Sequence, residues 1–479
     1  MKYFILSIFS VLTISNACYA SVWYVGPTRA YTVPSNVMGL VATGDTVEID
    51  SGTYSGDVGT WRTDSLIIRC TSGYAHLEAA GNVAQKKGIW VVDGNHTYIE
   101  GIEFSGCAIS EADGGNGAGI RLEGLGLECL RCYFHDNQEG ILTGNDTQCD
   151  VTIEACEFDH NGVETGGAAG FEHNIYVGHS RSFTLKFCYF HGAIVGHEVK
   201  SRANRNYILY NHIVDGPLGD GSYSIDLPNG GLSFVIGNSI EKGSNTENST
   251  VVDYGAEGII NPDSEFYFVN NTIVTDRQPT TFMNIAAGGK AKLINNIFAG
   301  ATHLMNGTAD TISNIITSDT SFFHFRDVAA FDYRIAAPFP GIMSATDPGS
   351  INGFSLRPVS AYVDPLDSMD ISEQPLEIGA YPATANGSVE MPKMGKTCYN
   401  YPNPFDRTTE ISILPEYDGP SVTLSVYNDA GFLVLQSIHP VRNAYLACDR
   451  GILPAGTYHY QITSGNGREI GEGSMVISP

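Results

Sequence analysis

The sequence predicts an all-β protein, in which a solenoid of stacked parallel strands is followed by a small antiparallel β-sandwich. Two observations in the 479 residues favour this architecture. Short stretches that alternate apolar and polar residues recur every 23–33 residues through the middle of the chain, and such alternation indicates strands with one buried face. Glycine is frequent, with 54 residues, so we expect many sharp turns between these strands.

The N-terminal residues have the pattern of a targeting segment. Lys2 precedes an apolar run from Tyr3 to Ile14, and Cys18-Tyr19-Ala20 places small residues at positions −3 and −1 of a cut before Ser21. This pattern predicts a secretory signal peptide over residues 1–20. The run is too short to span a bilayer, and we expect no transmembrane segment in the mature protein.

Seven motifs define the repeat, each beginning with Cys or Asn after an alternating stretch. They are Cys132-Tyr133-Phe134, Cys156-Glu157-Phe158, Cys188-Tyr189-Phe190, Asn211-His212-Ile213, Asn238-Ser239-Ile240, Asn271-Thr272-Ile273 and Asn296-Ile297-Phe298. A strand, a sharp turn and a second strand in each repeat describe one coil of a parallel β-helix, whose coils stack about 4.8 Å apart. We expect the aligned Asn residues to form a hydrogen-bonded ladder. The aligned cysteines should be small buried side chains in the same row, because parallel stacking does not suit disulfide geometry.

Both ends of the repeat region resemble a known superfamily. Gly44-Asp45-Thr46-Val47 and Gly52-Thr53-Tyr54 resemble the N-terminal cap and first coil of right-handed parallel β-helix proteins of the pectate-lyase-like superfamily. Asp332-Tyr333-Arg334-Ile335 and Ile378-Gly379-Ala380-Tyr381 resemble the last coils of such proteins. The resemblance implies a right-handed parallel β-helix over residues 21–385. It leaves the activity open, because one fold hosts many functions, here lyases, hydrolases, epimerases, esterases and adhesins.

A second, smaller domain follows a linker at residues 386–397. The short alternating stretches Ile411–Leu414, Val422–Tyr427 and Tyr458–Ile462 predict an Ig-like antiparallel sandwich over residues 398–479. Together with the motif Tyr399-Asn400-Tyr401-Pro402-Asn403-Pro404-Phe405, this domain resembles the C-terminal sorting domain of type IX secretion cargo. The resemblance implies a partner in the outer-membrane secretion machinery, and a protein that is secreted or attached to the outer cell surface.

The charge distribution restricts the class of partner. The chain has 26 Lys and Arg against 52 Asp and Glu, a net charge of −26, which argues against a nucleic-acid partner because nucleic acids require a basic face. Residues 181–205 are the exception, with only Glu198 acidic among Arg181, Lys186, Lys200, Arg202 and Arg205. A local cationic patch focuses anions, so we expect an acidic polysaccharide as the ligand of a secreted protein that acts as a monomer.

The candidate site follows from aligning one strand of each coil by its apolar anchor. The anchors are Ile120, Ile141, Ile175, Val199, Ile225 and Val252. Neighbours of an inward residue point outward in a strand. One face should therefore display a common set of polar side chains, namely Asn174, Tyr176, Glu198, Lys200, Arg202 and Asp226, with Asp253 continuing the row.

These residue types fit a uronate lyase. Such an enzyme needs a base for the proton next to the sugar carboxylate and positive charge for the resulting enolate. We assign Lys200 as the base, with Tyr176 as a second candidate base or acid, and Arg202 as the bidentate partner of the carboxylate. His197 would shuttle protons. The remaining candidates would contact substrate: His173, Asn174, Glu198, Asp226 and Asn229.

Alternatives stay open for the same residues. Lys200 and Asp226 are also placed to form a simple surface ion pair. Asp226 and Glu198 suit the carboxylate pair of a glycoside hydrolase or ligands of calcium. Calcium is the one cofactor that the sequence leaves open, and no residue is assigned as a metal ligand. A non-catalytic glycan-binding protein or adhesin and a uronan epimerase therefore compete with the lyase.

Overall fold

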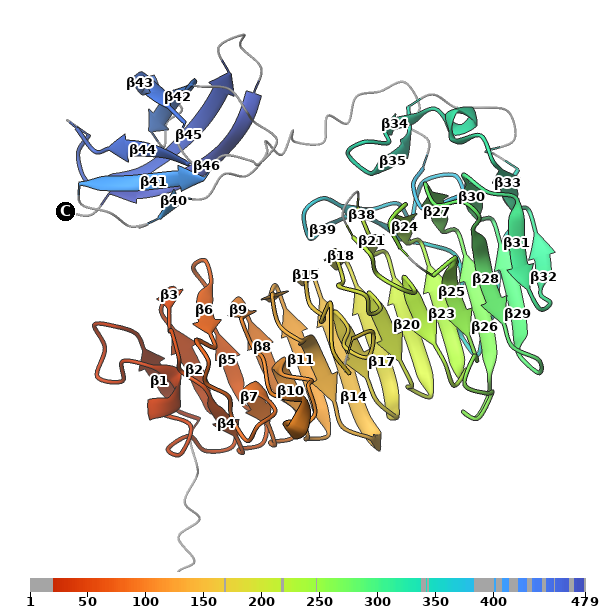
Figure 1. The fold of residues 1–479 in the computed structure, drawn as a ribbon, viewed down its shortest axis with the longest axis horizontal. Coiled ribbons are helices and arrows are strands. Elements are labelled where there is room, and N and C mark those ends of the chain that lie inside the picture. Colours follow the sequence, from red (N-terminus) through yellow and green to blue (C-terminus); the bar gives the residue numbers. More distant parts are fainter. Residues whose placement is uncertain are drawn as a thin grey trace, which may run out of the picture. The chain divides into compact units, whose positions relative to one another are not determined.

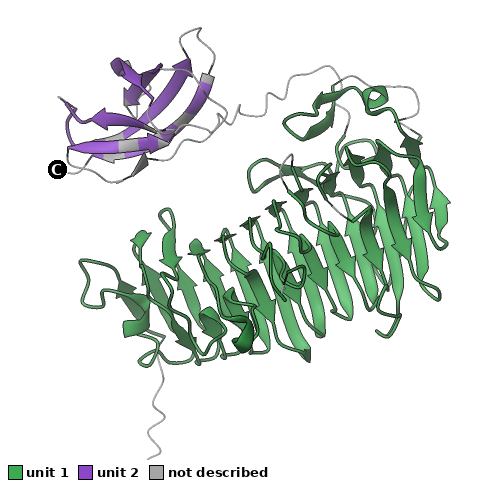
Figure 2. Ribbon diagram, in the orientation of Figure 1, with its two compact units in different colours: residues 1–386 green, residues 387–479 purple. Residues whose placement is uncertain are grey.

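The structure, a computed structural model, describes most of the chain in two compact units, Met1–Asn386 and Gly387–Pro479 (Figure 2). The described residues are 20–167, 169–216, 219–246, 248–336, 342, 344–382, 400–401, 407–412, 421–428, 433–441, 445–451, 453–464 and 469–477. The predicted signal peptide up to residue 19 and the predicted linker lie outside the described residues, as do Tyr399 and Pro402–Phe405 of the C-terminal motif.

The first unit is a parallel β-helix, as the repeat predicts (Figure 1). The chain visits three long parallel sheets in turn, here named A, B and C, and each coil adds one strand to each sheet. Sheet A contains β1 (Val22–Val25), β2 (Thr46–Ile49), β5 (Ile67–Arg69), β8 (Thr97–Glu100), β11 (Gly126–Leu130), β14 (Asp146–Glu154), β17 (Ser180–Lys186), β20 (Arg205–Leu209), β23 (Leu232–Ile236), β26 (Glu265–Val269), β29 (Lys290–Ile294) and β32 (Asp310–Ile312).

The other two sheets complete the coils. Sheet B contains β3 (Gly52–Thr53), β6 (Ala75–Glu78), β9 (Ile102–Ser105), β12 (Tyr133–His135), β15 (Glu157–Asp159), β18 (Tyr189–His191), β21 (His212–Val214), β24 (Ser239–Lys242), β27 (Thr272–Thr275), β30 (Ile297–Ala299) and β33 (Ile315–Thr317). Sheet C contains β4 (Gly59–Trp61), β7 (Gly88–Val92), β10 (Ala118–Leu122), β13 (Glu139–Thr143), β16 (Ile175–Val177), β19 (Val199–Ser201), β22 (Ile225–Leu227), β25 (Thr250–Tyr254), β28 (Thr281–Ile285) and β31 (His303–Asn306). Three short 3-10 helices lie at η1 (Pro34–Asn36), η2 (Glu111–Asp113) and η3 (Thr320–Phe323). Among the described residues, no helix is long and apolar enough to cross a membrane.

The ladder predicted at the turn between sheets A and B is confirmed. The Nδ2 atom of Asn211 donates to Oδ1 of Asn238 at 2.9 Å, and the same bond links Asn238 to Asn271. The cysteines occupy the same row, because the backbone N–H of Cys132 donates to Sγ of Cys156 at 3.3 Å. Each rung thus satisfies a buried backbone group of the preceding coil. Beside this row, an aromatic stack fills the interior: Phe104, Phe134, Phe158 and Phe190.

The segment after β33 does not form the last coils that the sequence predicted, and this expectation is wrong. Strand β35 (Asp332–Ile335) pairs antiparallel with β34 (Phe325–Asp327), and the chain then runs back along the outside of the solenoid. Two further hairpins follow: β36 (Ser350–Ile351) with β37 (Phe354–Ser355), and β38 (Ser360–Val363) with β39 (Asp367–Asp370).

This return segment covers apolar side chains on the outside of two sheets. Phe354 packs on Tyr207 and Phe234 of sheet A, and Tyr333 joins Val274 and Ile297 of sheet B in a second cluster. Burial of these outward apolar side chains stabilises the return segment against the solenoid.

The second unit consists of two antiparallel sheets. One has the order β40 (Asn400–Tyr401), β41 (Thr408–Ser412) and β44 (Tyr445–Asp449). The other has the order β43 (Leu433–Pro440), β42 (Ser421–Asn428), β45 (Gly456–Ser464) and β46 (Glu469–Ile477). The strands predicted near Ile411, Val422 and Tyr458 are confirmed within β41, β42 and β45.

Candidate functional site

The outward row on sheet C has the register that the anchor alignment predicted. Ile175 pairs with Val199, and Val199 with Ile225. The side chains beside these anchors therefore lie on successive coils in the order Tyr176, Lys200, Asp226, Asp253 and Asn284. Strands β16, β19, β22 and β25 thus bring four chemically active side chains into one line.

Neighbouring groups cover this row, although the sequence predicted that it faces solvent. Lys200 is 9% exposed, Asp226 is 3% exposed and Asp253 is fully buried. The loop after β25 folds back on the row, since the backbone N–H of Ala256 donates to Asp253 and the Glu257 carboxylate reaches Arg202. The expectation of an open charged face is therefore wrong. These charges are desolvated, which strengthens their mutual electrostatic interactions.

Arg202 holds a carboxylate in the way that the sequence assigned to it, but the carboxylate belongs to the protein. Its Nη1 and Nη2 atoms donate to the two oxygens of Glu257 at 2.5 and 2.7 Å. Its Nε donates to the Tyr176 hydroxyl at 2.7 Å, and Nη1 also donates to Oδ1 of Asn229 at 2.6 Å. The guanidinium is thus fixed in a bidentate arrangement next to the outward row.

Lys200 lies between the ring of Tyr176 and the carboxylate of Asp226. Its Nζ is 5.3 Å from the ring centroid and 3.4 Å from Oδ2 of Asp226, so the predicted ion pair is present. Burial raises the pKa of Asp226 to about 7, against the opposing effect of Lys200, and the charge of Asp253 adds to the rise. Oδ1 of Asp226 is buried and has no hydrogen-bond partner in the structure. Asp226 can therefore exchange a proton near neutral pH.

His173 and His197 form a stacked pair beside this cluster. Their rings are 4.5 Å apart and nearly parallel. Nδ1 of His173 accepts the backbone N–H of His197 at 2.9 Å, and Nδ1 of His197 accepts that of Tyr223 at 3.2 Å. Burial, with the nearby positive charge of Lys200, lowers the pKa of both imidazoles well below the usual range. Both rings are therefore neutral with the proton on Nε2.

The Nε2 atoms of these two histidines point to different surroundings. Nε2 of His197 lies 3.3 Å from Oδ2 of Asp226. The same carboxylate oxygen is paired with Lys200, so Asp226 links the imidazole to the lysine. Nε2 of His173 is buried with no partner in the structure, and the His173 ring packs edge-on against Tyr176. His197 thus belongs to the proton-exchanging cluster, whereas His173 leaves one unused donor beside it.

Two residues predicted to contact substrate are hydrogen-bonded within the interior. Asn174 and Glu198 are fully buried and do not join the outward face. Asn174 accepts from Nδ2 of Asn161 at 2.8 Å and donates to Glu198, whose other oxygen accepts the backbone N–H of Ala193 at 3.1 Å. The expectation that Asn174 and Glu198 lie on the outward face is therefore wrong, because Glu198 ends a second ladder at the turn before sheet C.

The predicted cationic patch is divided between two faces. Arg181 and Lys186 lie on β17 of sheet A, where they pair with Asp150 and Glu154. Arg205 begins β20 of the same sheet, so Lys200 and Arg202 are the patch residues that reach the sheet C cluster. Strand alternation and the change of sheet separate side chains that are close in sequence.

Glu257 is a residue of the site that the sequence analysis missed. It lies in a loop outside the repeat, and its partner Arg202 is 55 residues earlier. The repeat pattern of the sequence therefore gives no signal for this contact. Two groups of candidate metal-ligand side chains were also missed: among the described residues, the donor atoms that converge closely enough for an ion lie on or beside the strands of sheet B.

Comparison with known proteins identifies the C-terminal domain and the fold. Residues 400–474 match the family model of the secretion system C-terminal sorting domain, so the protein is secreted or attached to the cell surface. The chain is similar to the crystal structure of pectate lyase Pel9A with a TM-score of 0.50 and 14% identity, over 76% of this chain and 96% of that one. At this identity the likeness shows the parallel β-helix fold alone. No curated protein sequence matches the chain.

Proposed function

We propose that this exported β-helix protein acts on an acidic polysaccharide as a uronate-type lyase, by β-elimination at the sheet C cluster. The observation that carries the proposal is the bidentate Arg202–Glu257 pair, at 2.5 and 2.7 Å. The Glu257 side chain is half exposed, so a sugar carboxylate can displace it and take over both hydrogen bonds. A uronate in that position would lie beside Lys200 and Tyr176.

Each step of an elimination has a group within this cluster. Arg202 neutralises the uronate carboxylate and stabilises the enolate that forms when the neighbouring proton leaves. Lys200 passes its own proton to the Asp226 carboxylate, which lies 3.4 Å away, and then accepts the proton from the sugar. The Tyr176 hydroxyl, held by Arg202 at 2.7 Å, donates a proton to the departing glycosidic oxygen. His197 connects Asp226 to further proton transfer, and Asn229 positions the guanidinium.

In a second assignment, Tyr176 serves as both the base and the acid. A tyrosine that loses its proton acts as base and then returns the proton to the leaving oxygen, with Lys200 stabilising charge. The substitution Tyr176→Phe keeps the shape of the site and distinguishes Lys200 as the base from Tyr176 as the base. Under the first, Tyr176→Phe retains proton abstraction and loses leaving-group protonation, whereas under the second it loses both.

A non-catalytic glycan-binding protein is the second candidate function. The observation in its favour is that both cations of the cluster are already paired, Lys200 with Asp226 and Arg202 with Glu257. An exposed Phe171 beside the hollow lined by Glu111, Gly114, Gly167 and Glu172 would add a stacking surface for a sugar. A uronan epimerase would use the same base and carboxylate site and differ only in returning the proton.

The deciding measurement is absorbance near 235 nm, where the conjugated double bond of an elimination product absorbs. The full chain would be assayed against pectate, alginate, hyaluronan, chondroitin and ulvan, with and without calcium. We expect a rise on one polymer that falls at least about 100-fold in Lys200→Ala. Lys186→Ala on sheet A, whose lysine is also ion-paired, is the matched control and should keep full activity.

The other outcomes separate the candidates. Polymer binding by affinity electrophoresis with no absorbance and no new reducing ends would reject the lyase and favour the binding protein. An NMR change in sugar configuration without chain cleavage would instead identify an epimerase. Activity that survives in both Lys200→Ala and Arg202→Ala would reject the assignment of this cluster.

A further inference from the structure

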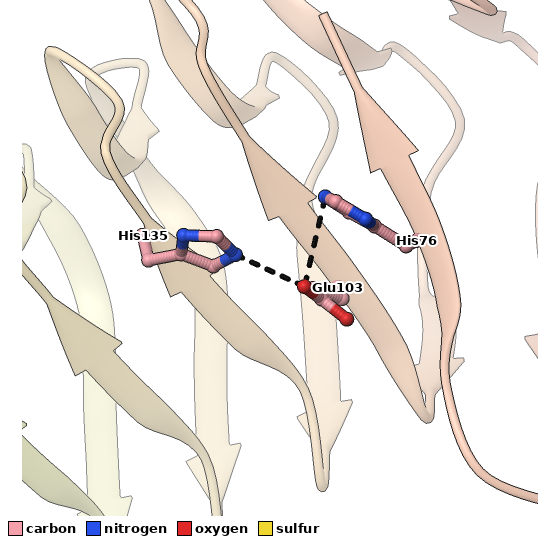
Figure 3. Close-up of side chains that lie close together, drawn as sticks. All are labelled: His76, Glu103 and His135. Carbon is pink, nitrogen blue, oxygen red and sulfur yellow. Dashed lines mark hydrogen bonds and ion pairs between the residues drawn. The ribbon is translucent and has the colours of Figure 1, made fainter. Parts of the chain in front are cut away.

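The outer face of sheet B carries a cluster of metal-ligand side chains that the sheet C mechanism does not use. His76 lies on β6, Glu103 on β9 and His135 on β12, three neighbouring strands of the sheet (Figure 3). His76 and Glu103 are direct register partners, and His135 is in the adjacent outward row opposite Ser105. Three successive coils therefore each contribute one ligand-type side chain to one point.

The donor atoms converge as the ligands of one ion do. Oε1 of Glu103 lies 3.6 Å from Nε2 of His76 and 3.0 Å from Nε2 of His135, and the donor atoms of all three residues lie within 4.8 Å of one another. With zinc–ligand bonds of about 2.1 Å, the edge of a tetrahedron is about 3.4 Å. Side-chain rotations are therefore sufficient to bring these atoms to coordination distance, and no backbone change is needed.

The surroundings of the cluster support a ligand role. Nδ1 of His135 lies 2.7 Å from a carboxylate oxygen of Asp136, which is the carboxylate–histidine arrangement found behind metal ligands. Ser105 Oγ lies 2.6 Å from Nε2 of His76, within hydrogen-bonding distance of the imidazole nitrogen that faces the cluster. The side chains of His76, Glu103 and His135 are 24%, 21% and 18% exposed, so an ion has access from solvent.

We propose that His76, Glu103 and His135 bind a divalent transition-metal ion, with Zn²⁺ as the first candidate. Two imidazole nitrogens and one carboxylate oxygen suit zinc, copper or nickel, whereas calcium and magnesium prefer oxygen ligands throughout. Three protein ligands leave a fourth position for water. A bound ion would connect three consecutive coils from outside and stabilise the N-terminal half of the solenoid.

A second cluster on the same sheet provides a built-in comparison. Asp159, His160 and His191 also converge, but both ring nitrogens of His191 lie at 3.0 Å from carboxylates, of Asp159 and Glu157. His135 has an equivalent pair of carboxylate contacts, with Glu103 and Asp136, so the two clusters differ instead at their other histidine, where the side chain of His160 is 57% exposed and that of His76 is 24% exposed.

The proposal is tested by Zn²⁺ titration of the full chain, without an affinity tag and after treatment with a chelator, by isothermal calorimetry at pH 7.5. We expect one site per chain and a rise in the thermal unfolding midpoint with Zn²⁺. His135→Asn and Glu103→Gln should each weaken binding at least about tenfold, and Asp136→Asn should weaken it to a smaller extent. His191→Asn, the matched control, should leave the affinity unchanged.

A spectroscopic readout guards against variants that fail to fold. Cu²⁺ bound to the unmodified protein should show hyperfine coupling to two imidazole nitrogens by electron paramagnetic resonance. His76→Asn should reduce this to one. No Zn²⁺ binding by the unmodified chain, binding that persists in both His135→Asn and Glu103→Gln, or loss only in His191→Asn would each overturn the proposal.

Discussion

Glu257 contacts the candidate site through two hydrogen bonds, which it accepts from Nη1 and Nη2 of the Arg202 guanidinium. Arg202 holds the pKa of this carboxyl below its usual range, so Glu257 stays ionised at neutral pH. On the proposed function, a substrate carboxylate must compete with this internal anion. The residue then sets the affinity for substrate rather than the chemistry of proton transfer.

Glu257→Gln should therefore favour substrate, because the amide forms a weaker, neutral hydrogen bond with Arg202. We expect the KM for the polyuronate to fall about tenfold, which corresponds to about 1.4 kcal/mol, with little change in kcat. Initial rates at 235 nm measure both constants. Glu128→Gln, at an exposed position on sheet A, is the control for the loss of one negative charge. A KM that stays the same or rises in Glu257→Gln would contradict the competition.

The register of the sheet C row was predictable from the sequence, since one residue per coil is fixed by hydrogen bonding between successive strands. Tyr176, Lys200 and Asp226 follow from that register alone. The burial of the row was not predictable, because Glu257 and the stacked His173–His197 pair lie in turns whose length and path follow no period. Asn174 and Glu198 were misplaced for the same reason: they precede the strands, where alternation of side chains does not apply.

At the level of structural elements, the turn between sheets A and B depends on its Asn row. Asn238 accepts from the backbone N–H and the side chain of Asn211, both at 2.9 Å, and donates to the Ile208 carbonyl and to Asn271. Each of these partners is buried. The ladder thus connects one coil to the next along the solenoid, in the direction in which the coils stack.

Asn238→Ala should destabilise the β-helix strongly, because it leaves several buried donors and acceptors unpaired, at about 1–3 kcal/mol each. We expect a loss of at least about 3 kcal/mol, measured by urea unfolding of the full chain followed by tryptophan fluorescence. Cys156→Ala in the same row is the comparison, because it removes a weaker sulfur acceptor from Cys132 and should cost less. Equal losses in the two variants would show that the Asn contacts are not the source of stability.

The coil repeat also accounts for the sheet B cluster, because it brings together three residues that are far apart in the sequence. His76, Glu103 and His135 are 27 and 32 residues apart, as are neighbouring coils elsewhere in the chain. This spacing is too wide for a local metal-binding motif. The cluster can be found in the sequence only by aligning successive coils and comparing their outward-facing residues on sheet B. That alignment needs the register of sheet B, which the Tyr-Phe-His and Glu-Phe-Asp segments at 133–135 and 157–159 supply.

Considering the whole molecule, acidic residues outnumber basic ones, and some of the acidic side chains lie in the interior. The chain has a net charge of −26, and several carboxyl groups are buried, among them Glu241 and Asp226. Burial, with the nearby Asp215, raises the pKa of Glu241 to about 8. Between pH 4.5 and 8 such a group is ionised in the unfolded chain and protonated in the folded one. The unfolded state then binds fewer protons, so stability falls as pH rises.

We therefore expect the thermal unfolding midpoint to decrease steadily from pH 5 to pH 8. Glu241→Gln removes one of the responsible groups, so the decrease should be shallower in this variant and its advantage over the unmodified protein should be greatest at pH 8. Differential scanning fluorimetry at four pH values measures the slope. Glu128→Gln is again the exposed control and should reproduce the original slope. Parallel slopes for all three proteins would contradict the assignment to Glu241.

The buried cysteines have a consequence for the order of events during export. All the cysteines that the structure describes are buried as free thiols, and burial raises the pKa of Cys107 to about 12 and that of Cys149 to about 11. Thiolates are the reactive form, so the folded protein resists oxidants. An unfolded chain has no such protection. The coils must therefore close before the chain meets an oxidising environment, and the time available for folding is set by the rate of thiol oxidation.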